Sequence, residues 1–308
     1  QEKEMYGIFI TEKEQPICDF LLRVNNHYHL NCVLRVAGGW VRNKLLRMDN
    51  SLLNEDGSSS SSSSSSSACC GDIDIALDKC MGVQFAEKVL DYEKMNDMPD
   101  QHRTIGVISA NPEQSKHLET ATTHIFGESI DFVNLRCEEY ANGGGSSGGG
   151  SGDGDDCTSN GNSGSKRIPH AIRVGTATED AYRRDLTINS MFYNINESKI
   201  EDLTGRGIDD LKRGVVRTPL PALQTFLDDP LRVLRAVRFA AYFNFVVADE
   251  LIEAARDARG ARALSGKGSR ERVGIELANM LQGPDPVGAF ALLREMKIDH
   301  VVFALSSF

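Results

Sequence analysis

The sequence predicts an α+β domain at residues 1–224, followed by an all-helical domain at residues 225–308. Before about Thr225, short apolar or β-branched runs lie between helical patterns, whereas helix follows helix after it. A length of 308 residues is enough for one large domain or two ordinary ones. We therefore expect a mixed sheet covered by helices, with a smaller helical unit behind it.

Each predicted element has a local reason. Apolar or alternating runs predict the strands, and apolar spacing of three and four predicts the helices. In the helical part, Asp229 is a good N-cap and Pro230 suits the first position of a helix. The next helix ends at Gly283 and Pro284. The strands are residues 33–37, 72–77 and 130–135, and the helices include residues 41–46, 84–92 and 269–281.

Two segments lack the apolar side chains that would offset the entropy of ordering them. They are residues 54–70, with ten consecutive serines, and residues 141–166, rich in glycine and serine. Strand-like or helical patterns flank both segments. We interpret them as flexible insertions that lengthen loops within one domain, in preference to linkers between domains.

Charge excludes a general attraction to nucleic acid. The 34 Lys and Arg residues stand against 44 Asp and Glu residues, which gives a net charge of −10. Any phosphate-binding site must therefore be local.

Seven cysteines without a CxxC pair argue against a disulfide framework or a zinc site, and favour a reducing compartment. No apolar run is long enough for a membrane span, and the first residues lack the layout of a signal peptide. We expect a soluble intracellular protein of the cytoplasm, with the nucleus and the mitochondrion as alternatives. The chain begins with Gln, so an upstream targeting segment is compatible with the sequence.

The first candidate site is GDIDIALD. In a strand, Asp72 and Asp74 project from the same face, and their paired charges favour a hard cation such as Mg²⁺. Asp131, on a third strand, is expected either to join this site or to activate an attacking hydroxyl. The alternative for a bare DxD pattern is an exposed edge strand with solvated aspartates.

The second candidate is a glycine turn before a helix. Gly38 and Gly39 end a strand, and backbone N–H groups in this geometry can cradle a phosphate. Arg42, one turn into the helix, is expected to add positive charge there. Gly-Gly, then Arg, then DxD is a layout suited to phosphoryl transfer.

The third candidate is EDAYRRDLTIN. Asp185 and Asn189 are spaced to share one helix face, and Arg184 adjoins them. The alternative is a solvated helix stabilised by two ion pairs, Glu179 with Arg183 and Asp180 with Arg184.

The fourth candidate is DDPLR, in which Asp229 and Arg232 lie one helical turn apart. A carboxylate only accepts hydrogen bonds and a guanidinium only donates them. This pair therefore matches the amino group and ring nitrogen of cytosine and adenine, and it mismatches uracil and guanine. The alternative is an N-cap with an ordinary intrahelical ion pair.

These motifs occur in the order found in class II nucleotidyltransferases of the polymerase-β superfamily, the family of tRNA nucleotidyltransferases and bacterial poly(A) polymerases. AGGWVRN with GDIDIALD resembles motif A, RRDLTIN resembles motif B, and DDPLR resembles motif D. DLTGRGIDDLKRG resembles motif C, to which we assign no chemistry. SRERVGIEL resembles motif E, whose Arg270, Glu271 and Arg272 form either a structural ion-pair cluster or an approach to RNA. Longer stretches are similar to the eukaryotic CCA-adding members.

The resemblance implies a polymerase-β-like head and a helical neck with the active site between them. It implies nucleotide addition to the tRNA 3′ end from CTP and ATP, with Mg²⁺ held by Asp72 and Asp74. The implied nucleotide contacts are Gly38, Gly39 and Arg42 with the triphosphate, Arg184, Asp185 and Asn189 with the ribose, Asp229 and Arg232 with the base, and Arg235 beyond them.

The sequence departs from the family at Asn43, where an aspartate is usual and would orient Arg42. The serine insertion precedes Asp72. The sequence ends about where the neck passes into the body in this family, so we expect the body and tail helices that hold tRNA either to be absent or to lie beyond this sequence. The rival functions are a poly(A) polymerase, a partial enzyme that adds only CC or only A, and a non-catalytic RNA-binding subunit. Among the enzymes, specificity would depend on a flexible loop near residues 95–116.

Overall fold

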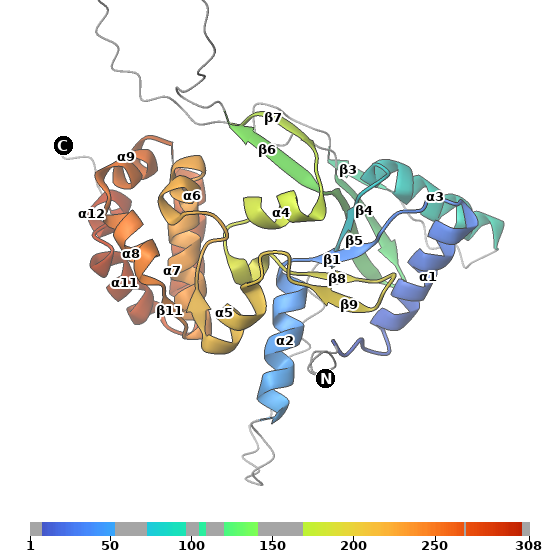
Figure 1. Ribbon diagram of the computed structural model, residues 1–308, viewed down its shortest axis with the longest axis horizontal. Coiled ribbons are helices and arrows are strands. Elements are labelled where there is room, and N and C mark those ends of the chain that lie inside the picture. The colour runs from blue at the N-terminus through green and yellow to red at the C-terminus, as the bar shows by residue number, and fades with distance from the viewer. Residues whose placement is uncertain are drawn as a thin grey trace, which may run out of the picture.

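We describe the protein from a computed structural model, which covers residues 8–52, 73–96, 105–108, 120–140, 169–267 and 269–303. Both glycine- and serine-rich insertions lie outside these ranges. Figure 1 shows a sheet with its helices on one side of the molecule and a cluster of helices on the other. The long helix α2 and the short helix α4 lie between these two parts.

The sheet is mixed, as predicted. Its seven strands run in the order β3-β4-β5-β2-β1-β8-β9, and only the central β2–β5 pair is parallel. These strands are β1 (Arg35–Ala37), β2 (Ile73–Leu77), β3 (Gly106–Ile108), β4 (Thr120–Ile125), β5 (Glu128–Asn134), β8 (Phe192–Asn194) and β9 (Lys199–Glu201). β6 (Arg136–Tyr140) and β7 (Pro169–Val174) form a separate hairpin, and β10 (Val215–Val216) pairs with β11 (Val246–Val247).

Helices α1 (Glu14–His27), α2 (Gly39–Leu52), α3 (Gly82–Met95), α4 (Ala177–Arg183) and α5 (Gly207–Arg213) accompany the sheet. The helical part contains α6 (Ala222–Asp228), α7 (Leu231–Phe243), α8 (Asp249–Arg256), α9 (Ala258–Lys267), α10 (Arg270–Gln282), α11 (Pro286–Glu295) and α12 (Asp299–Val302). Among the residues described, no helix combines the length and the apolar character that crossing a bilayer requires.

The predicted strands and helices are confirmed, with boundaries shifted by a few residues. One boundary matters for function: Pro230 is the N-cap and α7 begins at Leu231. The Asp229 carboxylate nevertheless accepts the backbone N–H of Leu231 at 3.2 Å, so Asp229 still caps the helix. Strand β3 lies within residues 95–116, which we predicted to be a flexible loop; residues 97–104 and 109–116 lie outside the described ranges.

The prediction of one helix carrying both Asp185 and Asn189 is wrong. α4 ends at Arg183, and residues 187–189 form a single 3₁₀ turn. The Asp185 side chain accepts the N–H of Leu186 at 2.8 Å, and this local bond competes with continuation of the helix. Leu186 and Ile188 are fully buried, so the chain turns into the core at this point.

One apolar core cluster extends from Ile17 in α1 to Ile298 beyond α11. The predicted domain boundary at Thr225 falls inside α6, which packs against α8 and α9. α6 therefore belongs with the helical part. The division into residues 1–224 and 225–308 stays a prediction.

Candidate active site

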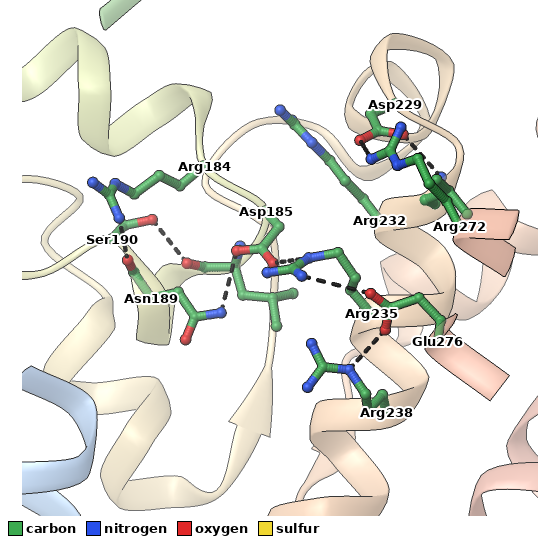
Figure 2. A network of polar contacts seen from close by, with 12 residues as sticks. Arg184, Asp185, Asn189, Ser190, Asp229, Arg232, Arg235, Arg238, Arg272 and Glu276 are labelled. Atoms are coloured by element: carbon green, nitrogen blue, oxygen red, sulfur yellow. Dashed lines mark hydrogen bonds and ion pairs between the residues drawn. The ribbon is translucent and has the colours of Figure 1, made fainter. Parts of the chain in front are cut away.

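A cavity of about 410 Å³ lies between the sheet and the helical part. Six of the predicted site residues line it: Asp74, Arg184, Asp185, Asp229, Arg232 and Arg235. The other lining residues are Ala76, Val133, Asn134, Arg136, Asp180, Arg183 and Arg272. Figure 2 shows Arg184 and Asp185, which follow α4, on one side, and Asp229, Arg232, Arg235 and Arg272, from the start of α7, from α7 itself and from α10, on the other. The cavity is rich in arginine although the chain as a whole is acidic. It is therefore a local basic site of the kind that the sequence analysis expected for phosphate binding.

One of the carboxylates predicted to bind metal, Asp74, lines the cavity. Asp74 on β2 lies directly opposite Asp131 on the parallel strand β5, and the Thr122 hydroxyl donates to Asp131 at 2.6 Å. Asp72 lies outside the described residues. Within the described ranges, no group of three or more His, Cys, Asp and Glu side chains forms a metal site. Two adjacent carboxylates supply the hard oxygen donors that Mg²⁺ prefers, so the donor chemistry fits this ion.

The glycine turn allows the backbone at Gly38 to approach the Arg184 side chain closely. Gly38 has φ +69°, and a Cβ atom there would lie 2.9 Å from the Arg184 guanidinium. Its N–H donates to the carbonyl of Met191 at 3.1 Å. Gly39 begins α2. The turn therefore touches Arg184 of the cavity, although neither glycine is among the lining residues.

Arg42 lies beside the glycine turn, because a Cβ atom on Gly39 would be 3.3 Å from its guanidinium, but Arg42 is not among the residues that line the cavity. Its side chain is buried, with its guanidinium 4.9 Å from the ring centroid of Phe239 and 4.8 Å from that of Phe243, both on α7. It donates to the side-chain oxygen of Asn189, and twice to that of Asn43 at 3.1 and 2.9 Å. Burial lowers the pKa of Arg42 to about 10. Arg42 thus joins α2 to the neck, and Asn43 orients it in place of the aspartate usual in the family.

Asp180 is a site residue that the sequence analysis placed only in a solvated ion pair. Its carboxylate is 1% exposed. One oxygen accepts from Arg183 at 2.5 Å and from the backbone N–H of Arg136 at 3.0 Å, and the other accepts from Arg184 at 2.8 Å. Burial raises the pKa of Asp180, but Arg184 and Arg183 outweigh it and hold the pKa below its usual value. Of the two ion pairs considered in the alternative interpretation, Asp180 with Arg184 is present, whereas Glu179 pairs with Arg173.

A chain of polar contacts runs from the 3₁₀ turn into the neck (Figure 2). Asn189 donates to Asp185 at 3.2 Å, so these two residues meet even without a shared helix. Arg235 donates to the other Asp185 oxygen at 2.7 Å and lies 3.6 Å from Glu276, which accepts from Arg238 at 2.7 Å. Burial raises the pKa of Asp185, yet the Arg235 charge outweighs it and lowers the pKa overall.

The predicted base-recognition pair is present, with partners that were not predicted. Asp229 accepts from Arg272 of α10 at 3.0 Å, and Arg232 donates to the backbone carbonyl of Arg183 at 2.7 Å. Asp229 therefore joins the start of α7 to α10. Arg272 belongs to the segment that resembles motif E, and its contact with Asp229 assigns that segment to the cavity.

The fold and the site define a member of the poly(A) polymerase head-domain family. The chain belongs to this family, because residues 34–217 match the sequence pattern described as "Poly A polymerase head domain".

Among its relatives, the mitochondrial CCA tRNA nucleotidyltransferase of Saccharomyces cerevisiae is 41% identical over 305 residues, which cover 96% of this chain and 48% of that protein. The chain therefore spans about half the length of this relative.

Two solved structures share the fold. They are complexes of a CCA-adding enzyme with CTP and with ATP, with TM-scores of 0.63 and 0.64 and 21% identity to this chain in both cases. They cover 96% and 97% of this chain, and the chain covers 53% and 54% of theirs.

Proposed function

We propose that this protein adds C, C and A to the 3′ end of tRNA, with CTP and ATP as donors. The observation that carries the proposal is the cavity itself, where Asp74 of the sheet faces Asp229 and Arg232 of the neck across a set of arginines. The similarity to a CCA tRNA nucleotidyltransferase over 96% of the chain supports this choice over a poly(A) polymerase.

The neck residues would select the base. Asp229 would accept the amino group of cytosine or adenine, and Arg232 would donate to the adjacent ring nitrogen. Each carboxylate oxygen can accept more than one hydrogen bond, so the contacts of Asp229 with Arg272 and Leu231 leave it able to do so. Uracil or guanine would place an N–H donor against Arg232, which only donates, and a carbonyl acceptor against Asp229, which only accepts. Both contacts would leave buried polar groups unpaired.

The head residues would hold the rest of the nucleotide. Arg183 and Arg184 are fixed by Asp180 at the cavity wall, where they would bind the phosphates. The N–H of Gly39 would face the same phosphates, because that of Gly38 is bonded to the carbonyl of Met191. Asp185 with Asn189 would lie against the ribose. Arg42 would act indirectly, because its guanidinium is held by Asn43 and Asn189.

Asp72 and Asp74 would hold Mg²⁺, with Asp131 beside them. When bound, the metal would lower the pKa of the attacking hydroxyl and neutralise charge on the triphosphate. The tRNA 3′ oxygen forms a bond to the α-phosphorus of the nucleotide while the bond from that phosphorus to the bridging oxygen breaks. Pyrophosphate leaves, and the hydroxyl proton passes to solvent.

The test uses the purified chain with Mg²⁺ and tRNA transcripts that end at the discriminator base, or after one or two added C residues. Each transcript receives one labelled nucleotide, and the products are separated on a sequencing gel. Addition of two C and then one A, stopping there, is the expected result. Asp74→Asn should abolish it, and Asp209→Asn, an exposed carboxylate of α5, is the matched control.

Other outcomes distinguish the rivals. Open-ended A tails would indicate a poly(A) polymerase, and addition of only C or only A would indicate a partial enzyme. No incorporation would contradict catalysis by this chain and favour an RNA-binding subunit. We also propose an intracellular location that includes a mitochondrial pool, which the name of the yeast relative supports.

A further inference from the structure

Two cysteines outside the cavity lie against each other. The Sγ atoms of Cys32 and Cys80 are 3.0 Å apart, although the residues are 48 positions apart in the sequence. Cys32 lies just before β1 and Cys80 just after β2, and these two strands pair side by side in the sheet. The contact therefore follows from the fold of the sheet.

Hydrogen bonds hold both cysteines in place. The backbone of Cys32 is bonded to the side chain of Asn25 through both its N–H and its carbonyl, at 3.1 and 2.9 Å. The next residue, Val33, donates to the Asp78 carboxylate at 2.9 Å, which ties the segment before β1 to the turn after β2. The carbonyl of Cys80 accepts from Asn134 at 2.8 Å. The two sulfur atoms thus meet between anchored backbones.

The surroundings suit a disulfide better than a metal. Within the described parts of the chain, no third His, Cys, Asp or Glu completes a metal site with this pair. The distance is about 1 Å longer than an S–S bond of about 2.05 Å, so a small movement would allow the bond. Cys32 is 1% exposed and Cys80 is half-buried, so a reagent reaches Cys80 first.

We propose that Cys32 and Cys80 form a reversible disulfide by exchange with a small-molecule disulfide of the glutathione type. The sulfur of Cys80 attacks the small disulfide and releases one small thiol, which leaves a mixed disulfide on Cys80. The sulfur of Cys32 then attacks the Cys80 sulfur and releases the second small thiol. Two protein thiols lose two electrons and two protons, and one small disulfide gains them.

The hydrogen bond between the two thiols separates their acidities. It lowers the pKa of Cys32, and the same bond, together with burial, raises the pKa of Cys80. Cys32 therefore has the greater thiolate character in the reduced pair. The order of attack is set by exposure, because Cys32 is 1% exposed and only Cys80 is within reach of a small disulfide.

The disulfide would affect residues near the cavity. It would close a loop that contains both the Gly38–Gly39 turn and Asp74 of β2. Asn134, which accepts the N–H of Gly82 at 3.2 Å and donates to Cys80, also lines the cavity. The redox state of the two cysteines would thus set how firmly the turn after β2 is held near Asp74.

The test is a peptide map of the full chain after equilibration with glutathione buffers of increasing oxidised fraction. Thiols are blocked with N-ethylmaleimide, and the digest is analysed by mass spectrometry without reduction. A peptide pair linking Cys32 to Cys80, released by dithiothreitol, is expected. Absence of this pair at every ratio, or equal linkage of Cys32 to several other cysteines, would overturn the proposal.

Variants provide a second readout that does not depend on nucleotide transfer. Cys32→Ser should trap the small thiol on Cys80, whereas Cys80→Ser should leave Cys32 reduced. The matched control is Cys137→Ser, which changes another partly exposed cysteine of the head and should behave as the unmutated chain. Oxidation should raise Tm by roughly 5 °C in the unmutated chain and the control only. Equal Tm in the oxidised and reduced protein would count against the disulfide.

Discussion

Asp180 is the residue that holds two arginine side chains of the cavity, those of Arg183 and Arg184. A single buried carboxylate receives hydrogen bonds from Arg183, from Arg184 and from the backbone of Arg136. Arginine side chains lose much rotational freedom when they are ordered, and an ordered pair binds phosphate with less entropic cost. Asp180 is therefore a positioning residue, because it prepares the groups that would touch the nucleotide.

We expect Asp180→Asn to raise the KM for CTP and ATP about tenfold or more, because a neutral amide holds two guanidinium groups poorly. Loss of one partner of buried ion pairs should also lower the free energy of unfolding by about 3 kcal/mol. Steady-state kinetics and urea unfolding measure the two effects. Asp180→Glu should restore part of the KM without restoring all of the stability. A KM equal to that of the unmutated chain would contradict the role.

Asn43 offers a test of how Arg42 is held. Its side-chain oxygen accepts two hydrogen bonds from the Arg42 guanidinium. Asn43→Asp would replace a neutral acceptor with an ionised one, so that both bonds join opposite charges, and we expect the free energy of unfolding to rise by about 1 kcal/mol.

Arg42→Lys is the contrasting change. A lysine cannot reach Asn43 and Asn189 at once, so we expect a loss of about 2 kcal/mol. Chemical unfolding of the three proteins measures both effects. If Asn43→Asp proved less stable than the original chain, Asn43 would not be the orienting partner.

At the scale of elements, α1 and α2 are joined by a buried ion pair. Glu14 of α1 and Lys44 of α2 lie 2.5 Å apart, with side chains only 3% and 8% exposed. Trp40 donates its indole N–H to the same carboxylate at 2.9 Å. Burial raises the pKa of Glu14, but hydrogen bonds from Lys44 and Thr11 outweigh it, so the pKa lies below its usual value.

The sign of the pH effect follows from that lowered pKa. The unfolded chain binds the proton at a higher pH than the folded chain, so Glu14 stabilises the fold above its unfolded pKa of about 4.3 and loses this effect as pH falls. Glu14→Gln should cost about 3 kcal/mol at pH 7 and clearly less near pH 3. Urea unfolding followed by Trp40 fluorescence measures this. Glu12→Gln, at an exposed position, should change little at either pH.

Local patterns predicted the elements well and their partners less well. Strands 33–37, 72–77 and 130–135 follow from alternation and composition, which act over a few residues. The break after Arg183 was missed because the spacing of Asp185 and Asn189 fits a helix equally well. The helix ends because the Asp185 side chain accepts the backbone N–H of the next residue, Leu186, and because Leu186 is buried.

The same limit applies to the site. Motif spacing identified Asp74, Asp229 and Arg232, because their chemistry is evident from residue type. The destination of Arg42 depends on two rings of α7, about 200 positions away, and no local pattern contains that information. The contact of Cys32 with Cys80 likewise arises only from the pairing of β1 with β2.

At the scale of the whole molecule, the head and the neck share one core. The apolar cluster is continuous from α1 to Ile298, and Arg42 of the head is enclosed by aromatic rings of the neck. The two parts are therefore expected to unfold together.

We expect a single cooperative transition. Trp40 is the only tryptophan and reports on the head. Circular dichroism also reports on helices α7 to α12, which belong to the neck. Fluorescence of Trp40 and far-UV circular dichroism should therefore give the same urea midpoint. Two separate midpoints would show that the domains at residues 1–224 and 225–308 are stable independently.

The alignment of β2 has a genetic consequence. β2 is held by ladder pairs on both sides, Val36 with Ile75 from β1 and Asp74 with Asp131 from β5. A slip of one residue would turn Asp74 to the opposite face, so these pairs determine its position. The ten serines precede the strand in the sequence, and the ladder partners of β2 are residues of β1 and β5. Alleles that gain or lose serine codons should therefore encode proteins in which the position of Asp74 is unchanged, which makes this tract a place where length polymorphism is tolerated.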